Sequence, residues 1–308
     1  MRKIIGIGET ILDIIFKGNC PVQALPGGST FNTMVSLGRL KIPARFITEV
    51  GRDKVGSIIL DFMRENNLST ENVHIFEEEC TQSAISLAFL NEQNDAQYAF
   101  YSRFPEKRLN CEWPVVEADD LLIFGSFYAV DPLLRDKVRE FVTYAKAQKA
   151  IIYYDVNFRK SHAHEIDQIM PAFIENIGYA DIVRGSAEDF EILLQERVAE
   201  RVYRDYFSSG LHNFIYTDGG NGVDFFSPSG YRHIDTPSIK TVSTIGAGDS
   251  FNAGILFGLW QKDIGKEEIS ALSLNGWEEI IKYGISFSAE VCQSYDNYIS
   301  LEFAAQYR

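Results

Sequence analysis

The stretch that decides the fold of this chain is Thr244-Ile245-Gly246-Ala247-Gly248-Asp249-Ser250-Phe251. Small residues precede a single acidic residue, and apolar residues then recur at helical spacing as far as Trp260. This order predicts a tight turn that leads directly into a helix. The first main-chain N–H groups of a helix lack intrahelical partners and lie at the positive end of its dipole, so the turn can bind an anion without a basic side chain.

Asp249 falls in the first turn of this predicted helix, beside the anion site. The positive end of a helix dipole stabilises a negative charge, so we expect the pKa of Asp249 to stay low. Its carboxylate can still accept a proton late in a reaction, when an attacking hydroxyl has become acidic. An anion site with an adjacent base is the arrangement that phosphoryl transfer to a hydroxyl requires.

A second glycine-rich turn, at residues 25–32, also leads into an apolar helical pattern. Pro26 and the paired glycines after it favour a tight turn, and Ser29 or Thr30 is expected to cap the helix. Asn32 falls in the first turn, where its amide can both donate and accept a hydrogen bond. Sugar hydroxyls are suited to such a partner, so this turn is a candidate sugar-binding segment.

Two common nucleotide-binding motifs do not occur in the sequence. Gly6 and Gly8 follow a predicted strand, but Ile11 stands where a dinucleotide fingerprint would have its third glycine. No GxxxxGK[ST] motif occurs either. An oxidoreductase on a dinucleotide-binding sheet is therefore disfavoured, and ATP would have to be bound by another device.

Composition and charge narrow the class of protein. The 308 residues carry a formal net charge of −14, which argues against binding to nucleic acids or to anionic membrane surfaces. The four cysteines are widely spaced and form no CxxC motif, which is typical of a reduced, cytoplasmic protein. We expect no signal peptide and no membrane span, because no apolar run is long enough.

Short apolar runs alternate with amphipathic helical patterns along the chain. Strands are predicted at 4–7, 46–50, 121–124, 151–154, 181–183 and 214–217, and helices at 30–40, 55–66, 133–148 and 166–177. Such alternation predicts an α/β fold with a mostly parallel sheet covered on both faces.

One segment, at residues 84–103, breaks this rhythm. Two β-rich runs, at 84–90 and 98–103, flank a polar turn, which indicates a β-hairpin inserted into the α/β frame. The hairpin is either a simple sheet edge or a lid that excludes water from phosphoryl transfer. Tyr98, Tyr101 and Arg103 lie on it.

Five motifs in order resemble those of the ribokinase-like (PfkB) family of carbohydrate kinases. Gly27-Gly28-xxx-Asn32 resembles its N-terminal signature, and Thr244-xx-Ala247-Gly248-Asp249 resembles its C-terminal signature. The segments between them that resemble family motifs are Gly51-Arg52-Asp53-Lys54-Val55-Gly56, Asp155-x-Asn157-x-Arg159 and Thr217-Asp218-Gly219-Gly220-Asn221-Gly222. The resemblance covers nearly the whole chain.

This resemblance implies a three-layer α/β/α fold over residues 1–308 as a single domain, with a small β lid built from about 13–25 and 84–103 that also often joins two subunits. It implies that Asp249 is the catalytic base and that the turn at 246–248 forms the anion hole. The implied sugar-binding residues are Asp13, Gly28 and Asn32. The implied residues on the ATP side are Thr217, Gly219, Gly222 and Thr244.

Two positions depart from the family pattern. Ser243 stands where an Asp usually helps to hold a monovalent cation, so we expect no strong potassium activation. Gly185 stands at the Asn position of an NxxE pattern that orients magnesium, and Glu188 remains at its acidic position. We still expect Mg²⁺, held through water by Glu188, because the ATP phosphates need charge neutralisation.

The choice of sugar stays open at this stage. Arg103 and Arg159 could together bind the carboxylate of a sugar acid, which would favour a 2-keto-3-deoxygluconate kinase. A neutral ketohexose such as fructose is our leading prediction, with ribose as a further alternative and a nucleoside less favoured. Because Ser243 and Gly185 both depart from the pattern near the phosphates, a non-catalytic, sugar-sensing relative is the alternative from another class.

Overall fold

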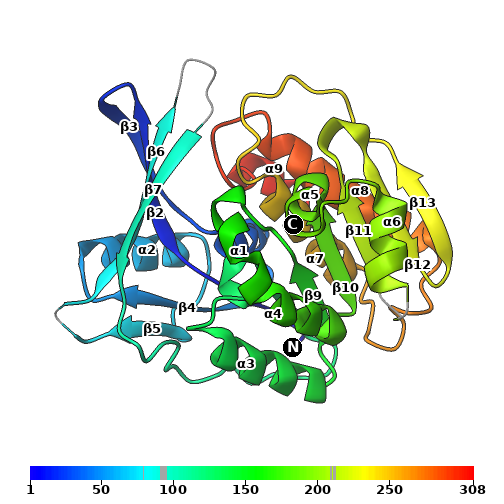
Figure 1. Ribbon diagram of the computed structural model, residues 1–308, viewed down its shortest axis with the longest axis horizontal. Coiled ribbons are helices and arrows are strands. Elements are labelled where there is room, and N and C mark those ends of the chain that lie inside the picture. Colours follow the sequence, from blue (N-terminus) through cyan, green and yellow to red (C-terminus); the bar gives the residue numbers. More distant parts are fainter. Residues whose placement is uncertain (79, 91–95, 209, 211–212) are drawn as a thin grey trace.

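The computed structural model describes residues 1–78, 80–90, 96–208, 210 and 213–308, and only the backbone of residues 90 and 96–98. A nine-stranded sheet forms its centre, in the order β13-β12-β11-β10-β9-β8-β1-β4-β5 (Figure 1). Its strands are β1 (Ile4–Ile7), β4 (Ala44–Gly51), β5 (Val73–Phe76), β8 (Leu121–Gly125), β9 (Ile151–Asp155), β10 (Ile182–Ser186), β11 (Asn213–Thr217), β12 (Val223–Ser227) and β13 (Gly230–Ile234). The strands from β11 to β5 are parallel, and β12 and β13 add an antiparallel edge.

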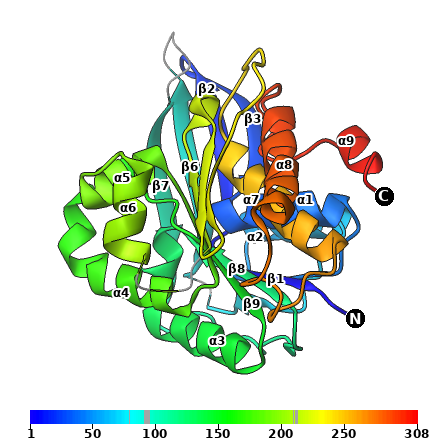
Figure 2. The same ribbon diagram turned by 90° about the vertical axis from the view of Figure 1, so that its right-hand side faces the viewer.

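The central strands are apolar on both faces because helices cover both sides of the sheet. In β1, Ile4 packs into the core on one face, whereas Ile5 and Ile7 pack into the core on the other. Figure 2 shows α1, α7 and α8 on one side of the sheet and α3 to α6 on the other. The helices are α1 (Ser29–Arg39), α2 (Lys54–Glu65), α3 (Arg135–Ala147), α4 (Ile166–Tyr179), α5 (Ala187–Leu194), α6 (Ala199–Val202), α7 (Ala247–Gln261), α8 (Leu274–Val291) and α9 (Leu301–Ala305). This arrangement confirms the predicted three-layer α/β/α fold.

A second, four-stranded sheet stands beside the main body, in the order β3-β2-β6-β7 (Figure 1). Its strands are β2 (Ile11–Lys17), β3 (Cys20–Gly27), β6 (Gln82–Leu90) and β7 (Ala96–Arg103). The strands β2 and β6 pair in parallel, so two segments far apart in the sequence share this sheet. The sheet lies in the segments that the sequence assigned to a lid. The polar turn of the predicted hairpin, 91–95, lies outside the described residues.

The predicted helices and strands match observed elements with boundaries shifted by a few residues. No strand was predicted for β5, β12 or β13, whereas β2 and β3 lie in the segment at 13–25 that the family resemblance assigned to a β lid. Within the residues that the structure describes, no helix is both long enough and apolar enough to cross a membrane.

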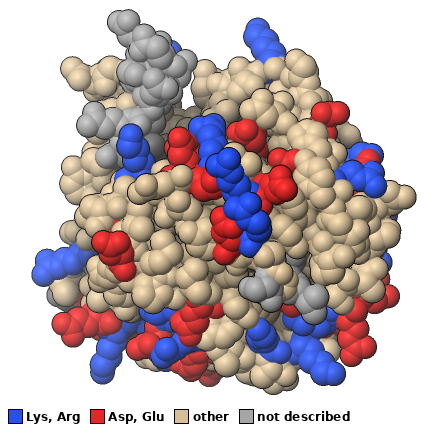
Figure 3. All heavy atoms as spheres, turned by 45° about the vertical axis from the view of Figure 1, so that its right-hand side comes forward, with Lys and Arg blue, Asp and Glu red and all other residues tan. Residues whose placement is uncertain are grey.

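On the face shown in Figure 3, Lys and Arg side chains lie next to Asp and Glu side chains at the centre and along the lower part, and much of the rest is uncharged. This face therefore presents no broad positive field, and an anion bound there would depend on local groups such as helix N-termini.

Candidate active site

The predicted site residues gather where the parallel strands of the main sheet end. In open α/β sheets, ligands bind outside the carboxyl ends of the strands. Here β9 ends at Asp155 and β11 ends at Thr217. The helices α1 and α7 both begin at this edge, and the Thr33 hydroxyl on α1 donates a hydrogen bond of 2.9 Å to the main-chain carbonyl of Asp249 on α7. This contact holds the two predicted glycine turns side by side.

Asp249 is bound by side chains from the start of α1. Ser29 Oγ donates a hydrogen bond of 2.9 Å to Asp249 Oδ1, and Asn32 Nδ2 donates one of 2.8 Å to Oδ2. Ser29 Oγ in turn accepts a hydrogen bond of 2.6 Å from Asn157 Nδ2. Three polar residues therefore fix the direction of the carboxylate.

The predicted low pKa of Asp249 is wrong, because the pKa of this carboxyl is raised to about 7. Asp249 is half-buried as a residue, and its carboxyl group is shielded from water. This loss of hydration is the largest influence on its pKa and raises it. The donors Asn32 and Ser29 lower it, and the negative charge of Asp155 raises it further. The error came from weighing the helix dipole alone, since burial outweighs the dipole here.

The turn before α7 leaves main-chain donors open. Gly246 is the N-cap residue, has φ of 76°, and provides no side chain to cap the helix. By contrast, Asp53 and Ser273 accept hydrogen bonds from the first turns of α2 and α8. The Ala247 N–H donates to the Thr244 carbonyl at 3.2 Å, so it is already engaged.

Among the described residues, no main-chain acceptor is found for the N–H groups of Gly246, Gly248 and Asp249. These open donors lie within the predicted anion hole at 246–248 and directly beside it. Two features require glycine at position 246. Its φ is positive, and a Cβ there would lie only 2.7 Å from Asn297 Cα.

On the side away from α7, Asp13 lies in β2 and accepts a hydrogen bond from the Ser86 hydroxyl of β6. Burial raises the pKa of Asp13, while Ser86 and the positive charge of Arg159 lower it. A Cβ on Gly27 would collide with Asp13 Oδ2. Gly28, with φ of 127°, is the N-cap residue of α1, so the capping roles expected for Ser29 and Thr30 are wrong, because Ser29 uses its hydroxyl on Asp249.

Arg184, which the sequence analysis did not identify, links the ends of three neighbouring strands. Its Nη1 pairs with Asp155 Oδ1 at 3.0 Å, and its Nη2 donates to Thr217 Oγ1 at 2.8 Å. Burial alone would lower the pKa of Arg184, but the carboxylates of Asp155 and Asp189 raise it overall. A Cβ on Gly248 would lie 3.0 Å from Arg184 Nη1, so the guanidinium packs directly against the anion turn.

The remaining predicted residues lie at the margins of this centre. Gly219 and Gly222 have φ of 52° and 103° in the turn after β11, and Thr244 is exposed just before the anion turn. Arg103 is exposed on β7. Arg159 is exposed too, yet its charge lowers the pKa of both Asp13 and Asp249. The side chain of Tyr98 lies outside the described residues.

Glu188 is exposed on the first turn of α5. Its neighbour Asp189 is buried instead and accepts hydrogen bonds from the main chain of Ser186 and Phe158. The two acidic residues therefore have different surroundings: Asp189 holds the local fold, and Glu188 faces the outside.

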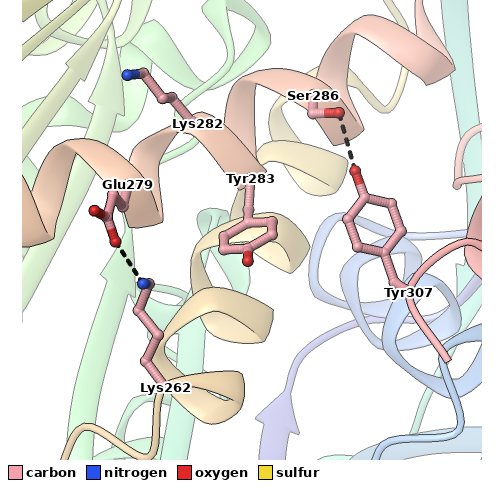
Figure 4. A pocket seen from close by; sticks show the side chains of 6 residues that line it. All are labelled: Lys262, Glu279, Lys282, Tyr283, Ser286 and Tyr307. Atoms are coloured by element: carbon pink, nitrogen blue, oxygen red, sulfur yellow. Dashed lines mark hydrogen bonds and ion pairs between the residues drawn. The ribbon is translucent and has the colours of Figure 1, made fainter.

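A pocket of about 410 Å³ lies elsewhere, at the far end of α7 (Figure 4). α7 has 15 residues, so this pocket is on the order of 20 Å from Asp249. Its basic groups are already paired: Lys262 binds Glu279 at 2.6 Å, and Lys282 binds Glu278 at 2.7 Å. It carries no group suited to phosphoryl transfer.

Comparison with known proteins identifies this arrangement of sheets and helices. The fold is ribokinase-like: fructokinase from Vibrio cholerae O395 with bound fructose, ADP and calcium superposes with a TM-score of 0.83 at 17% identity, covering 100% of this chain and 99% of that one. Aminoimidazole riboside kinase from Salmonella enterica, with aminoimidazole riboside and an ATP analogue, gives 0.81 at 20% identity, covering 99% and 98%.

The chain belongs to the pfkB family of carbohydrate kinases, whose model matches residues 1–304. It is an ATP-dependent carbohydrate kinase. A fructokinase from Rhizobium leguminosarum bv. trifolii is 27% identical over 266 residues, which cover 83% of this chain and 79% of that protein. A 5-dehydro-2-deoxygluconokinase from Bacillus thuringiensis (strain Al Hakam) is 26% identical over 264 residues, which cover 81% and 77%.

Proposed function

We propose that this carbohydrate kinase transfers the γ-phosphoryl group of ATP to a primary hydroxyl of a ketohexose, with fructose as the leading candidate. The observation that carries the proposal is the setting of Asp249. Its carboxyl has a pKa of about 7 and lies in the first turn of α7, directly after the open N–H groups of Gly246 and Gly248. A base with a pKa near neutrality combines a useful ionised fraction with a useful proton affinity.

In the proposed reaction, the sugar lies between Asp13 and Asp249. The Asp13 carboxylate accepts hydrogen bonds from sugar hydroxyls, and Asn32 keeps the Asp249 carboxylate aimed at the reacting hydroxyl. That hydroxyl oxygen forms a bond to the γ-phosphorus as the bond to the β–γ bridging oxygen breaks, and its proton passes to Asp249. The N–H groups of Gly246 and Gly248 stabilise the negative charge on the transferred group.

On the nucleotide side, Thr217, Gly219, Gly222 and Thr244 are proposed to line the ATP site. Among the described residues, no cluster of three or more His, Cys, Asp or Glu side chains could hold a metal ion. Mg²⁺ that keeps most of its waters and binds chiefly to phosphates needs no such cluster. We propose that Mg²⁺ neutralises the phosphate charge and that Glu188 contacts it through water.

Potassium is not expected to activate this kinase strongly. The Ser243 hydroxyl accepts a hydrogen bond of 3.2 Å from the Ile245 N–H, and the Ser243 N–H donates to the Cys292 carbonyl at 3.3 Å. These contacts support a turn held by neutral hydrogen bonds rather than by a carboxylate and a cation.

A sugar acid is the main alternative substrate. Arg159 acts electrostatically on both Asp13 and Asp249, so its charge reaches the proposed sugar site. A guanidinium there suits the carboxylate of 2-keto-3-deoxygluconate. Ribose is the third candidate, and a non-catalytic sugar sensor is disfavoured by the intact Asp249 site.

The second sheet is the proposed lid and the proposed dimer contact. Large side chains exposed on it are Val22, Phe89, Phe100 and Tyr101. By strand register, Phe89 and Tyr101 lie on the same face of this sheet, and exposed apolar side chains on one face support association with another copy of the chain. Light scattering in solution tests this, and a monomer at working concentrations would argue against it. The four free cysteines support work in the reducing cytoplasm.

The experiment that tests the function is a coupled ADP-release assay with D-fructose, D-ribose, 2-keto-3-deoxygluconate and a nucleoside panel, with and without potassium. We expect turnover with fructose and little effect of potassium. The Asp249→Asn variant should lose a factor of roughly 10² or more in kcat while still binding sugar. Near-normal turnover by this variant would contradict the role of Asp249.

A further inference from the structure

Asn297 occupies a position between the two halves of the site. It lies in the loop between α8 and α9, and its backbone abuts Gly246 of the anion turn. On its other side, Asn297 Nδ2 is 3.7 Å from the position that a Cβ on Gly27 would take, and that same position touches Asp13 Oδ2. One residue near the end of the chain therefore lies beside the anion turn with its backbone and near the predicted sugar carboxylate with its side chain.

The amide of Asn297 has no partner within the described part of the chain. The residue is only 6% exposed, yet no hydrogen bond to its side chain is found. Asn32 Oδ1 and Asn213 Oδ1 are examples of partnerless oxygens that are sealed from solvent, but the Asn297 amide is not among such sealed atoms. The amide therefore keeps a small exposed area, and its Nδ2 lies beside Gly27 and Asp13.

The loop that carries Asn297 is firmly attached to α1. The Ile299 N–H donates to Ser36 Oγ at 3.3 Å, and Arg39 Nη1 donates to the Ile299 carbonyl at 2.8 Å. The Arg39 guanidinium also stacks on the Tyr298 ring at 4.5 Å. An amide held this way loses little further freedom when a ligand binds, which favours a binding role over space filling.

We propose that Asn297 is a sugar-binding residue that hydrogen-bonds a hydroxyl of the carbohydrate close to the carbon that receives the phosphoryl group. Its Nδ2 donates a hydrogen bond to the sugar oxygen, and its Oδ1 can accept a hydrogen bond from a sugar hydroxyl. This inference rests on the proposed function of the Asp13 and Asp249 site. It adds a residue from the C-terminal loop to a sugar site otherwise built from β2 and α1.

The test compares Asn297→Ala with Ser294→Ala. Ser294 lies in the same loop, and its hydroxyl accepts a hydrogen bond from the Asp296 N–H at 3.1 Å. Its replacement removes a polar group from the loop but keeps Asn297 and the attachment of Ile299 to α1. We expect Asn297→Ala to raise KM for D-fructose about 3- to 10-fold, the effect of losing one neutral hydrogen bond, with KM for ATP unchanged. Ser294→Ala should leave both unchanged.

Monodeoxy analogues of D-fructose separate binding from a structural role. The wild type should discriminate against one analogue that lacks the contacted hydroxyl, and Asn297→Ala should lose that discrimination while keeping the others. If D-fructose, D-ribose and 2-keto-3-deoxygluconate all fail to release ADP, the proposed function is wrong and this inference falls with it. If the wild type phosphorylates a sugar and Asn297→Ala keeps its sugar KM and its discrimination, the inference alone is overturned.

Discussion

Because Asp249 is the proposed catalytic base, we predict that its hydrogen bond from Ser29 helps to set the pH range over which this kinase works. Ser29 Oγ donates to Asp249 Oδ1 at 2.9 Å and lowers a pKa that burial has raised to about 7. Ser29→Ala removes this donor and leaves Asn32 as the remaining donor to the carboxylate. The pKa of Asp249 should therefore rise in the variant, because the charged form loses more stabilisation than the neutral form.

The size of the shift follows from the hydrogen bond. A hydrogen bond to a charged group contributes about 1.5–3 kcal/mol, and one pKa unit corresponds to about 1.36 kcal/mol. Asn157, which now donates to Ser29, and incoming water would replace part of the loss. We therefore expect a rise of about one unit, from about 7 to about 8.

The assay is kcat/KM for the sugar as a function of pH at saturating ATP. Asp249 acts as a base only when ionised, so activity is low below its pKa and reaches a plateau above it. A rise of about one unit lowers activity roughly 8-fold near pH 6.5 but hardly changes it near pH 9. Thr33→Val is the matched control, because Thr33 donates to the main-chain carbonyl of Asp249 rather than to its carboxylate. An unmoved midpoint in Ser29→Ala, or an equal shift in Thr33→Val, would refute this reasoning.

Further expectations concern stability and substrate affinity. Because the folded pKa of Asp249 is raised from 3.8 to about 7, its ionisation weakens the fold increasingly between those pH values. Asp249→Asn should therefore raise the free energy of unfolding by about 2–4 kcal/mol at pH 7.5 and by little at pH 4, and thermal unfolding that gains nothing at pH 7.5 would contradict this. Arg184→Met leaves Asp155 buried without its partner and should lower the free energy of unfolding by about 3–5 kcal/mol in urea denaturation, with part of the loss restored by adding Asp155→Asn. Asp13→Ala should raise KM for the sugar and leave KM for ATP unchanged in steady-state assays, and an unchanged sugar KM would remove Asp13 from the site.

Local patterns in the sequence were sufficient to predict the layers of the fold and both glycine turns. The helices after Gly246 and Gly28 could be predicted because small residues directly precede a helical apolar pattern in the chain. The pairing of β2 with β6 could not be predicted from local patterns, since β3, α1, β4, α2 and β5 lie between these two strands in the sequence. Parallel pairing of that kind depends on the tertiary fold rather than on any short pattern.

The features of the site that the sequence did not predict all depend on contacts between segments far apart in the chain. The pKa of Asp249 depends on which side chains cover its carboxyl, and the dipole of its own helix was the only influence visible in the sequence. Arg184 is a single basic residue at the end of a predicted apolar strand, and this position could have marked it as a candidate site residue. No sequence pattern marks Asn297, because its proposed role depends on the contact of its loop with α1.

A phosphate in the proposed nucleotide site, beside Gly248 and the Thr217 that Arg184 holds, should couple nucleotide binding to the protonation of Asp249. A phosphate that arrives beside Gly248 and Thr217 brings negative charge close to Asp249, whose carboxyl is about half-ionised at neutral pH. That charge increases the affinity of Asp249 for a proton, and by thermodynamic reciprocity a protonated Asp249 binds the phosphate more tightly. Nucleotide binding near pH 7 should therefore take up a fraction of a proton from solution, and the heat of binding should change with the ionisation enthalpy of the buffer.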